Sequence, residues 1–591
     1  MTSLHEPNHG FDDSRRLTGP NRHFATPAVT LSPLGAAAAN TDAHRRWRAR
    51  VQAMCAELGW PDPQPQVLIH PGGTLLVFAA PHDTLFTATE VNEWAWELAA
   101  AEADAVGASA TTAAVPAGPT SFDRAQDLGE TAAAVFAARA AEERSQSPAA
   151  LRAAAVAHGV PLFEDDREVS LGAGTGSRRW LRGDLPPLQS ISWSELHDIP
   201  TALVTGSNGK TTTVRLLAAM AEAAGLTAGY SSTEGIVVGG QMTAGGDYSG
   251  PDGARAVLRD PRVQMAILET ARGGILRRGL AVQRADVAVV TNISADHLGE
   301  YGIAAADGLA ETKLVVAHAL AAGGTLVLNA DDAVLAAAAA RLPHVAAVHQ
   351  ALFALDHDHP TLIAMRTAGG STCGVRGREL VLFHRGTTQV FGDAHALPLT
   401  LGGAARYNIA NLAAAALAGT ALGLPAAAIA DTLTRFGSTP ADNPGRLECW
   451  WYRGARVLID YAHNPEGLAG LLRVARDLQP QRLLLLLGQA GNRDDGAIIE
   501  LARTAAQFAP EQVVVKELPL MLRGRAPGEV SGLIARALAA SGLPPARIIV
   551  EPDEERAARL LLNAARPHDV VVLPVHTEAV RRALRNALAA T

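Results

Sequence analysis

A short glycine-rich turn between an apolar strand and a helix constrains the fold of this chain more than any other feature of its sequence. Residues 201–205 read TALVT, residues 206–210 read GSNGK, and the helical run TTTVRLLAAMAEAAG follows. Strand, turn and helix in this order build parallel sheets, whose strands are buried on both faces. The same apolar pattern returns in MAILET, VAVVTNI and TLVLNA, so we predict a doubly wound α/β domain.

The remaining sequence divides into parts with different composition and periodicity. Residues 1–40 are rich in Pro, His, Asn and Gly without a clear period, so we predict a flexible tail there. Helical and strand-like runs in residues 41–196 predict a small α/β region whose role the sequence leaves open. Residues 197–443 hold the doubly wound domain. Residues 444–591 repeat its pattern in RVLIDYAH, RLLLLLGQAG and EQVVVKE, which predicts a second, Rossmann-like domain.

Charge and cysteine content argue against several classes of protein. Lys and Arg number 51 against 59 Asp and Glu, a net charge of −8, so we expect no nucleic-acid partner. Cys55, Cys373 and Cys449 lie far apart, so neither a disulfide framework nor a zinc cluster is expected. The N-terminus lacks the pattern of a signal peptide, and no apolar run approaches the roughly 18 residues that span a bilayer. We therefore expect a cytoplasmic protein with no membrane partner.

The lysines are so few that each one is informative. Lys210, Lys313 and Lys516 stand beside 48 arginines. Where arginine is the default cation, a lysine indicates a need for a compact ammonium or for an amine that reacts. Each lysine is therefore a candidate functional residue.

The turn before the helix has the composition of a phosphate-binding loop. Its glycines let backbone N–H groups point at phosphate oxygens, and the helix N-terminus favours anions. Lys210 can reach the terminal phosphates, and the Thr211 hydroxyl can hold Mg²⁺. The common G-x-x-x-x-G-K-[ST] pattern is not met because position 204 is Val, so an ordinary strand-to-helix turn is the alternative. The predicted ATP-binding residues here are Gly206, Asn208, Gly209, Lys210, Thr211 and Thr212.

Several ordered motifs resemble those of one enzyme family. TGSNGKTTT is similar to the nucleotide loop of Mur ligases and folylpolyglutamate synthetases, usually written TGTNGKTTT, with Ser207 as the departure. Between about residues 199 and 580 the chain most resembles the Mur-ligase-like half of cyanophycin synthetases. The resemblance implies a central ATP-binding Mur ligase domain, a C-terminal Mur ligase domain, and the use of ATP with two Mg²⁺ ions. The motifs that carry it are ETARGGIL (269–276), TNI with DHLG (291–299), RYN (406–408), PGR (444–446), DYAHNP (460–465), GNRDD (491–495), KE (516–517) and RGR (523–525).

Residues at the ends of two predicted strands are candidate magnesium ligands. Glu269 and His297 each follow an apolar strand, at the edge where parallel sheets keep their ligand crevice. With Thr211 they would complete a Mg²⁺ shell, the alternative being solvated edge residues. The resemblance implies that Lys313 is carbamylated and binds the second Mg²⁺, whereas a lysine whose ammonium snorkels to water is the alternative. Lys210, Glu269, His297 and Lys313 are the predicted catalytic residues.

The resemblance also implies contacts to the nucleotide and the substrates from later parts of the chain. Asn408 would contact the adenine, with a helix cap as the alternative. Four residues would close over the nucleotide and exclude water, namely Arg446, Asp460, His463 and Arg493. Four residues would bind substrate carboxylates, namely Arg493, Lys516, Arg523 and Arg525. After Lys-Glu the sequence reads LPLM where cyanophycin-type loops are acidic, which disfavours arginine as the incoming amino acid.

Together these features predict an ATP-dependent amide ligase. The γ-phosphate would pass to a substrate carboxylate, and an amine would attack the resulting acyl phosphate, releasing phosphate beside ADP. The predicted partners are a small-molecule or peptide acceptor and an amino acid or amine. The alternatives are a peptidoglycan-precursor or folate-type glutamate ligase, a nucleotide-binding switch without ligase activity, and a plain nucleotide hydrolase.

One departure from the resemblance lies ahead of the phosphate loop. Residues 167–180 resemble the start of the ATP-grasp domain of cyanophycin synthetases, but about 25 residues separate them from the loop. We therefore expect no ATP-grasp domain and a single active site. A separate ATP-grasp ligase partner and a homo-oligomer are left open.

Overall fold

The structure is a computed structural model that describes residues 10–107, 131–146, 148–294, 300–303 and 305–590. The chain forms two compact units. The first comprises Met1–Gly206, Gly225–Leu328 and Asp332–Gln350, and the second comprises Ser207–Ala224, Asn329–Asp331 and Ala351–Thr591. The break after Gly206 falls inside the phosphate loop and within the predicted domain 197–443, whose boundaries stay a prediction.

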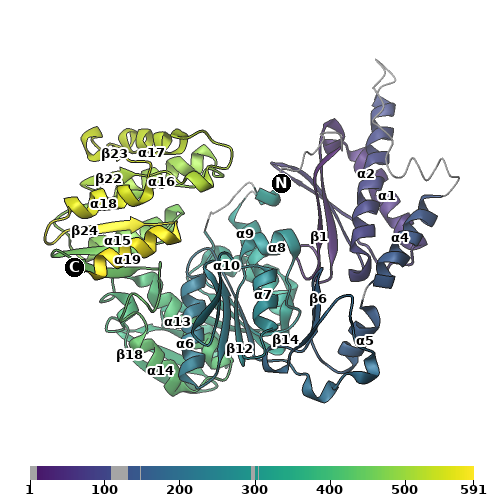
Figure 1. Ribbon diagram of the computed structural model, residues 1–591, viewed down its shortest axis with the longest axis horizontal. Coiled ribbons are helices and arrows are strands. Elements are labelled where there is room, and N and C mark those ends of the chain that lie inside the picture. The colour runs from purple at the N-terminus through teal and green to yellow at the C-terminus, as the bar shows by residue number, and fades with distance from the viewer. Residues whose placement is uncertain (1–9, 108–130, 147, 295–299, 304, 591) are drawn as a thin grey trace. The chain divides into compact units, whose positions relative to one another are not determined.

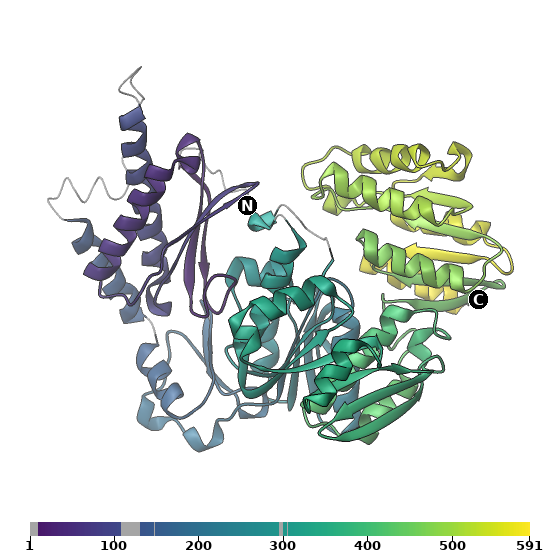
Figure 2. The same ribbon diagram turned by 180° about the vertical axis from the view of Figure 1, so that it is seen from behind.

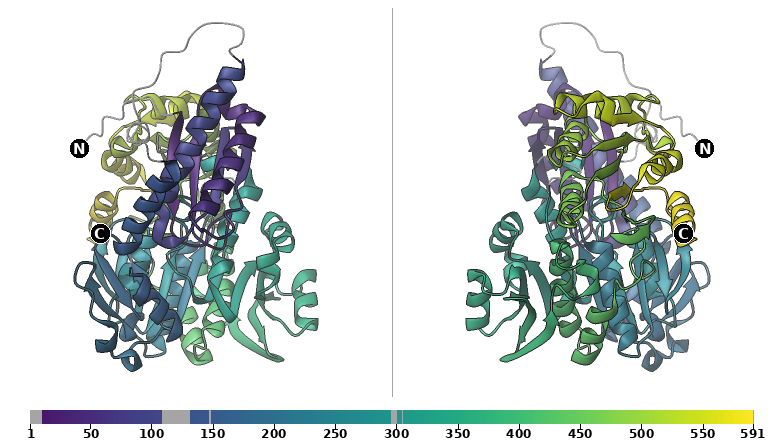
Figure 3. Two further views of the ribbon diagram at one scale, coloured as in Figure 1. Left: turned by 90° about the vertical axis from the view of Figure 1, so that its right-hand side faces the viewer. Right: turned by 90° about the vertical axis from the view of Figure 1, so that its left-hand side faces the viewer.

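The first unit begins with an antiparallel sheet of order β1-β2-β4-β3. Helices α1 and α2 run beside each other, and α2 packs on the sheet (Figures 1 and 3). Trp47, Phe78 and Trp96 are fully buried in the core that they share. The elements are β1 (Phe11–Leu17), β2 (Ala28–Pro33), α1 (Thr41–Glu57), β3 (Gln66–His70), β4 (Gly73–Ala79) and α2 (Leu85–Gly107).

The prediction of a flexible tail over residues 1–40 is wrong for residues 10–40. β1 and β2 pair along their length, and β2 also pairs with β4. β1 reads FDDSRRL and does not alternate between apolar and polar residues, so its sequence gives no strand signal. Its stability comes instead from pairing with the buried strand β2, which is a tertiary effect.

The first unit continues with helices and a small antiparallel sheet of order β5-β6-β7. Arg259, which directly follows α7, is buried. It donates to the Ser170 hydroxyl at 3.0 Å and to the Phe163 carbonyl at 3.2 Å, and so joins this sheet to α7. The elements are α4 (Ala132–Gln146), α5 (Ala149–Ala157), β5 (Leu162–Glu164), β6 (Glu168–Leu171), β7 (Arg178–Leu181) and α7 (Pro251–Leu258), after which Arg259 lies.

A longer run of strands in the first unit has the order β11-β10-β9-β12-β8-β13-β14. The pairs from β9 to β14 are parallel, whereas β10 is antiparallel to both neighbours. Every residue of β8 and β12 is buried, as expected for strands covered on both faces. The predicted doubly wound α/β class is therefore confirmed. The elements are β8 (Thr201–Thr205), β9 (Ala228–Ser232), β10 (Gly235–Val238), β11 (Gln241–Gly245), β12 (Met265–Glu269), α8 (Arg272–Arg278), β13 (Ala285–Val290), α9 (Ala306–Leu314), β14 (Leu320–Asn329), α10 (Ala333–Arg341) and α11 (Pro343–Ala346).

The second unit contains the helix that follows the phosphate loop and a β-rich segment. Helices α13 and α14 both pack against α6, and strands β16, β17 and β18 form an antiparallel meander. The elements are α6 (Lys210–Ala223), β15 (His349–Asp356), α12 (Pro360–Thr367), β16 (Ser371–Arg376), β17 (Glu379–His384), β18 (Thr387–Asp393), α13 (Arg406–Ala421) and α14 (Ala426–Arg435).

The rest of the second unit is a sheet of order β19-β20-β24-β21-β22-β23. All its pairs are parallel except that of β19 with β20. Helices cover both faces of this sheet (Figure 2). The elements are β19 (Glu448–Tyr452), β20 (Ala455–Asp460), α15 (Pro465–Asp477), β21 (Leu483–Leu487), α16 (Asp495–Gln507), β22 (Gln512–Val515), α17 (Glu529–Ala540), β23 (Ile548–Val550), α18 (Glu554–Ala564), β24 (Val570–Pro574) and α19 (Glu578–Ala589).

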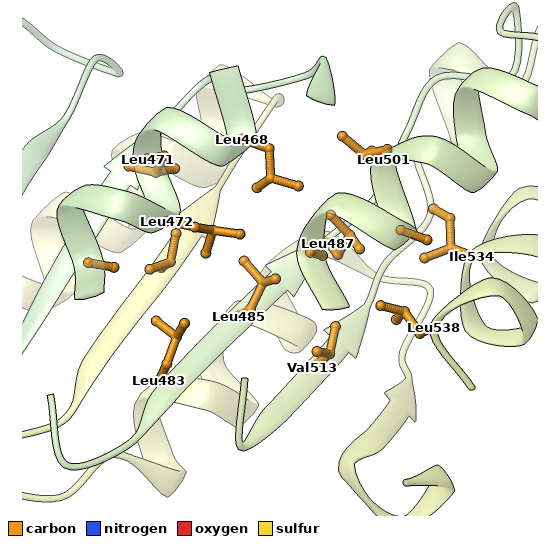
Figure 4. Packing of buried hydrophobic residues seen from close by; sticks show 14 of the residues in the cluster. Leu468, Leu471, Leu472, Leu483, Leu485, Leu487, Leu501, Val513, Ile534 and Leu538 are labelled. Atoms are coloured by element: carbon orange, nitrogen blue, oxygen red, sulfur yellow. The ribbon is translucent and has the colours of Figure 1, made fainter. Parts of the chain in front are cut away.

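Strand β21 shows why this second sheet has two covered faces. Its five leucines are all buried. Alternate side chains point to opposite faces, so Leu483, Leu485 and Leu487 pack with α15, α16 and α17 (Figure 4), whereas Leu484 and Leu486 pack with α18 and α19. The predicted Rossmann-like C-terminal domain is confirmed.

Among the helices of the described residues, none combines the length and the apolar character that a membrane span requires.

Candidate functional site

Two glycines give the loop after β8 a conformation that other residues do not adopt easily. Gly206 has φ +145° and Gly209 has φ +88°. A Cβ on Gly206 would lie 1.8 Å from the Thr291 hydroxyl oxygen, within the first unit. In the second unit, a Cβ on Gly209 would lie 2.3 Å from Asn411 Oδ1. The backbone is thus both left-handed and tightly enclosed, which requires glycine at these two positions.

The start of α6 has the features of an anion-binding helix terminus. Gly209 is the N-cap residue and supplies no side chain to cap the first-turn N–H groups. Lys210 is the first residue of the helix, and its Nζ donates to the Ser207 carbonyl at 3.0 Å. The helix dipole and a flexible ammonium therefore lie at one helix end.

Polar side chains from later parts of the second unit contact this loop and helix. Asn464 Nδ2 donates to Asn208 Oδ1 at 3.1 Å, and Asn443 Nδ2 donates to the Thr212 hydroxyl at 3.2 Å. Sequence reasoning missed both asparagines as functional residues. Asn464 lies inside the DYAHNP motif and Asn443 directly precedes PGR, so the motifs held the signal.

The predicted residue Arg446 also reaches the phosphate loop. Its guanidinium donates to the Thr211 hydroxyl at 3.4 Å and lies 4.7 Å from the centre of the Tyr461 ring. Asp460 accepts from the Leu447 N–H at 2.7 Å, which fixes the chain beside the arginine. Burial raises the pKa of Asp460, while the charge of Arg446 opposes that rise. His463 lies in the same turn, with Nδ1 3.2 Å from the Tyr461 carbonyl.

Two asparagines of α13 form a buried pair beside the loop. Asn408 and Asn411 are 2% and 4% exposed, and Asn411 Nδ2 donates to Asn408 Oδ1 at 3.1 Å. Asn408 Nδ2 in turn donates to the Leu399 carbonyl at 3.0 Å. The helix-cap alternative is wrong, because α13 begins at Arg406 and its N-cap is Ala405.

In the first unit, the carboxyl ends of three parallel strands lie side by side. Glu269 ends β12 and pairs in register with Val204 of β8, and Val290 of β13 pairs with Thr205. The Glu269 side chain is buried at 2% exposure, which rules out the alternative of a solvated edge residue. A carboxylate at this edge has the oxygen donors that Mg²⁺ prefers.

Lys313 lies on α9 and is 4% exposed, so the alternative of a lysine snorkelling to water does not hold. His297, the other predicted metal ligand, lies outside the described residues.

The prediction that Lys516 binds a substrate carboxylate is wrong. Its side chain is fully buried, and its ammonium donates to Glu554, to the Pro574 carbonyl and, at 3.0 Å, to His576 Nδ1. Burial lowers the pKa of Lys516 to about 8, while the charge of Glu554 opposes that shift. Partners within the chain thus occupy this ammonium.

The three predicted substrate arginines lie in the loops after β21 and β22. Arg525 donates to the carbonyls of Gly491 and Arg493, at 3.0 and 2.7 Å, and pairs with Asp495 at 2.8 Å. It therefore holds the two loops together. Arg523 is exposed, with φ +51°.

The fold and the loop define a doubly wound α/β protein with a phosphate-binding type of strand-to-helix turn. The sequence model of the Mur ligase middle domain matches residues 204–419, and that of the Mur ligase glutamate ligase domain matches residues 445–574. The chain therefore belongs to the Mur ligase family.

Individual relatives agree with this family. The chain is 36% identical over 386 residues to cyanophycin synthetase of Synechocystis sp., an alignment that covers 65% of this chain and 43% of that protein. It is 30% identical over 378 residues to UDP-N-acetylmuramoyl-L-alanyl-D-glutamate–2,6-diaminopimelate ligase of Xanthomonas campestris, covering 63% of this chain and 70% of that ligase. The match thus spans less than half the length of the cyanophycin synthetase. E. coli FolC in complex with DHPP and ADP has a TM-score of 0.49 and 19% identity, over 66% of this chain and 89% of that one.

Proposed function

We propose that the chain is an ATP-dependent carboxylate–amine ligase that joins an amino acid or amine to an acceptor carboxylate. An acceptor oxygen attacks the γ-phosphorus of ATP, and the bond from that phosphorus to the ADP oxygen breaks. The amine nitrogen then attacks the acyl carbon, phosphate leaves, and the amine loses a proton to give the amide. The observation that carries the proposal is the enclosed glycine turn that leads into Lys210 at the start of α6, whose N-cap residue is a glycine.

The residues of the loop divide the work of binding and charge stabilisation. The first-turn N–H groups of α6 orient the phosphates, and Lys210 stabilises the charge that develops on the transferred group. Arg446 and Asn443 hold the threonine hydroxyls of this turn in place. Asn408 contacts the adenine, while Asp460 and His463 order the segment that covers the nucleotide and keeps water from the acyl phosphate.

A magnesium site fits the residues at the end of β12. The buried carboxylate of Glu269 is a hard oxygen donor, and Lys313, once carbamylated, supplies a second one. We propose that Thr211 and His297 complete the ligands of two Mg²⁺ ions. Bound Mg²⁺ would neutralise phosphate charge during the transfer.

The amino-acid side of the reaction is assigned to the loops after β21 and β22. Arg493 and Arg523 bind substrate carboxylates, and Arg525, whose guanidinium is engaged by the Gly491 and Arg493 carbonyls and by Asp495 and Glu529, positions the loops that present them. The adjoining segment 518–521 has no acidic residue, and Leu520 is 91% exposed, so a guanidinium finds no carboxylate partner there. The resemblance to cyanophycin synthetases favours an acceptor of the aspartyl-peptide class, and we propose that the reaction takes place in the cytoplasm.

The test is phosphate release by the purified chain with ATP and Mg²⁺, across amino acids and short β-aspartyl peptides whose carboxylates carry ¹⁸O. A ligase releases phosphate only when an acceptor and an amine are both present. That phosphate carries ¹⁸O, because the acceptor oxygen leaves with it. A Lys313→Arg variant, which cannot be carbamylated, should lose this release.

Other outcomes separate the alternatives. Unlabelled phosphate without any acceptor, unchanged in the Lys313→Arg variant, would identify a nucleotide hydrolase. Binding of ATP without release under any condition would identify a nucleotide-binding switch. Labelled phosphate only with a muramyl-peptide or folate acceptor would identify a glutamate-type ligase.

A further inference from the structure

The loop between β1 and β2 contacts the C-terminal end of α8, within the first unit. Strand β1 itself packs against α8 (Figure 1). The Thr18 N–H donates to the Arg278 carbonyl at 2.8 Å, and the Leu280 N–H donates to the Pro20 carbonyl at 2.8 Å. Gly19 has no room for a side chain, because a Cβ there would lie 2.0 Å from the Leu280 carbonyl oxygen. The N-terminal sheet is thus joined by its backbone to the helix that follows strand β12.

A second contact holds the turn at Glu300–Gly302, ahead of α9. Tyr301 in this turn has φ +52°, a left-handed conformation that is costly for a tyrosine. The Arg15 guanidinium of β1 lies 4.7 Å from the centre of its ring. The ring of His70, which ends β3, lies so close that a Cβ on Gly302 would be 2.9 Å away. The N-terminal sheet therefore supports a strained turn.

The third contact reaches α9 itself. Arg22 Nη2 donates to Glu311 Oε2 at 2.9 Å, and Arg341 Nη2 donates to the other oxygen, Oε1, at 2.9 Å. The Arg22 side chain is 24% exposed and that of Arg341, on α10, is 49% exposed. The arginine of the N-terminal loop is thus the better-buried partner.

The loop that presents this arginine is ordered by a single side chain. Asn21 is 1% exposed, and its Nδ2 donates to the carbonyls of Gly19, at 3.1 Å, and Thr26, at 2.9 Å. Its Oδ1 accepts from the N–H groups of His23, at 2.9 Å, and Phe24, at 3.0 Å. A loop with four such bonds is preorganised, so the arginine loses little conformational freedom when it pairs.

We propose that residues 18–24 are a positioning element for α9, with Arg22 as its positioning residue. This inference rests on the proposed function, in which Lys313 acts at the magnesium site. Successive residues of a helix turn by about 100°, so Glu311 and Lys313 lie about 200° apart around α9. Glu311 is held at the partly exposed side of the helix, while Lys313 is buried. Fixing the carboxylate therefore fixes the rotation of α9 and the place of the lysine amine.

The test compares Arg22→Gln with Arg341→Gln in the full chain. These variants remove the two cations of one carboxylate, and only the first removes the N-terminal contact. We measure kcat, the KM for ATP and hydrogen exchange of α9 amides. For Arg22→Gln we expect roughly tenfold lower kcat, because small misplacements are costly in catalysis. The KM for ATP should stay within about twofold. Exchange of α9 should rise about two- to fivefold, as for loss of a partly exposed ion pair.

Two further variants separate positioning from a loss of folding. Arg22→Lys keeps the charge and should restore most of kcat. In Arg341→Gln all changes should be smaller, and both glutamine variants should keep the wild-type unfolding midpoint.

Three results would overturn the proposal. They are wild-type α9 exchange in Arg22→Gln, faster exchange with unchanged kcat, and equal effects in the two glutamine variants. If the wild-type chain shows no ligase activity with any substrate, the proposed function fails. The exchange measurement then decides by itself whether the loop orders α9.

Discussion

Lys210 and Lys516 lie in comparable places in the chain and have different surroundings. Each follows a strand of a parallel sheet, Lys210 after β8 and Lys516 directly after β22. Lys210 is partly exposed at the start of a helix whose N-cap is a glycine. Lys516 is fully buried against the carboxylate of Glu554, the first residue of α18, which follows α17 in the chain.

The comparison shows that a lysine at the carboxyl end of a parallel strand does not by itself make an anion-binding site. The turn before Lys210 is built from glycines that leave helix N–H groups uncapped by the N-cap residue. At Lys516 the chain supplies its own anion, so the ammonium contributes to folding. The scarcity of lysine does not distinguish a lysine that binds a ligand from one that stabilises the fold, because both roles need a compact ammonium.

The largest expected effect is the loss of activity in Lys210→Met. Removing one preorganised charge that stabilises a transition state costs about 10²- to 10³-fold in kcat. Because Lys210 is partly exposed, we expect the free energy of unfolding to change by less than about 0.5 kcal/mol. Steady-state phosphate release and urea unfolding measure the two quantities. A wild-type kcat in Lys210→Met would show that Lys210 is not a catalytic residue, and the contrast with Lys516 would then fail.

Lys516→Met should show the opposite behaviour. It removes the ammonium from the buried Glu554 carboxylate, which keeps the N–H groups of His576 and Thr577, at 2.8 and 3.0 Å, and the neighbouring His576 ring. Breaking a buried ion pair on one side costs about 3 kcal/mol or more of unfolding free energy. The KM for the amino acid should not change.

Arg523→Ala is the matched control for Lys516→Met. Arg523 lies in the loop that follows and is exposed. Its loss should raise the KM for the amino acid and leave the unfolding free energy within about 0.5 kcal/mol of wild type. A raised KM in Lys516→Met with unchanged stability would return Lys516 to the substrate site.

Sequence alone predicted the two parallel sheets because their strands are continuous apolar runs. Leu483–Leu487 is the simplest case, since strands covered on both faces have no polar positions. The same reasoning failed for β1, whose polar sequence becomes a strand only through its pairing with β2. The pattern of apolar residues in one segment indicates whether that segment is buried. It does not identify the strand with which the segment pairs.

The candidate site shows the same limit. The conformation of Gly206 and Gly209 was predictable, because the order strand, glycine turn and helix is local. The fate of Lys516 was not, because Glu554 and His576 are 38 and 60 residues away in the sequence. Only the folded chain brings these partners together.

A fourth variant sharpens the comparison by testing the glycine turn itself. Gly209→Ala places a Cβ 2.3 Å from Asn411 Oδ1 at φ +88°. A left-handed alanine costs about 1–2 kcal/mol of unfolding free energy, and the displaced asparagine adds to this. The control is Gly423→Ala, which has φ +79° and no atom within 4 Å of the added carbon. We expect Gly209→Ala to lose more unfolding free energy in urea than Gly423→Ala, and to lose ATP affinity as well, because its added carbon meets Asn411. Equal losses of unfolding free energy in the two variants would mean that the loop has room to adjust.

The last expected effect is the contribution of the Lys516 cluster to the pH dependence of stability, through the pKa of His576. Burial lowers the pKa of His576 to about 3, and the charge of Lys516 adds to the shift. The unfolded chain binds a proton near pH 6.5 and the folded chain does not, so stability falls as pH drops from about 6.5. By pH 5 the loss from this residue is about 2 kcal/mol, because each pH unit between the two pKa values costs about 1.4 kcal/mol. His576→Gln keeps an amide oxygen for Lys516 but does not titrate, so its unfolding free energy should fall less between pH 7 and pH 5 than that of wild type. The control is His349→Gln, because His349 is exposed. If the unfolding free energy of the wild type and of His576→Gln fell equally between pH 7 and pH 5, His576 would not be shielded from protons in the folded chain.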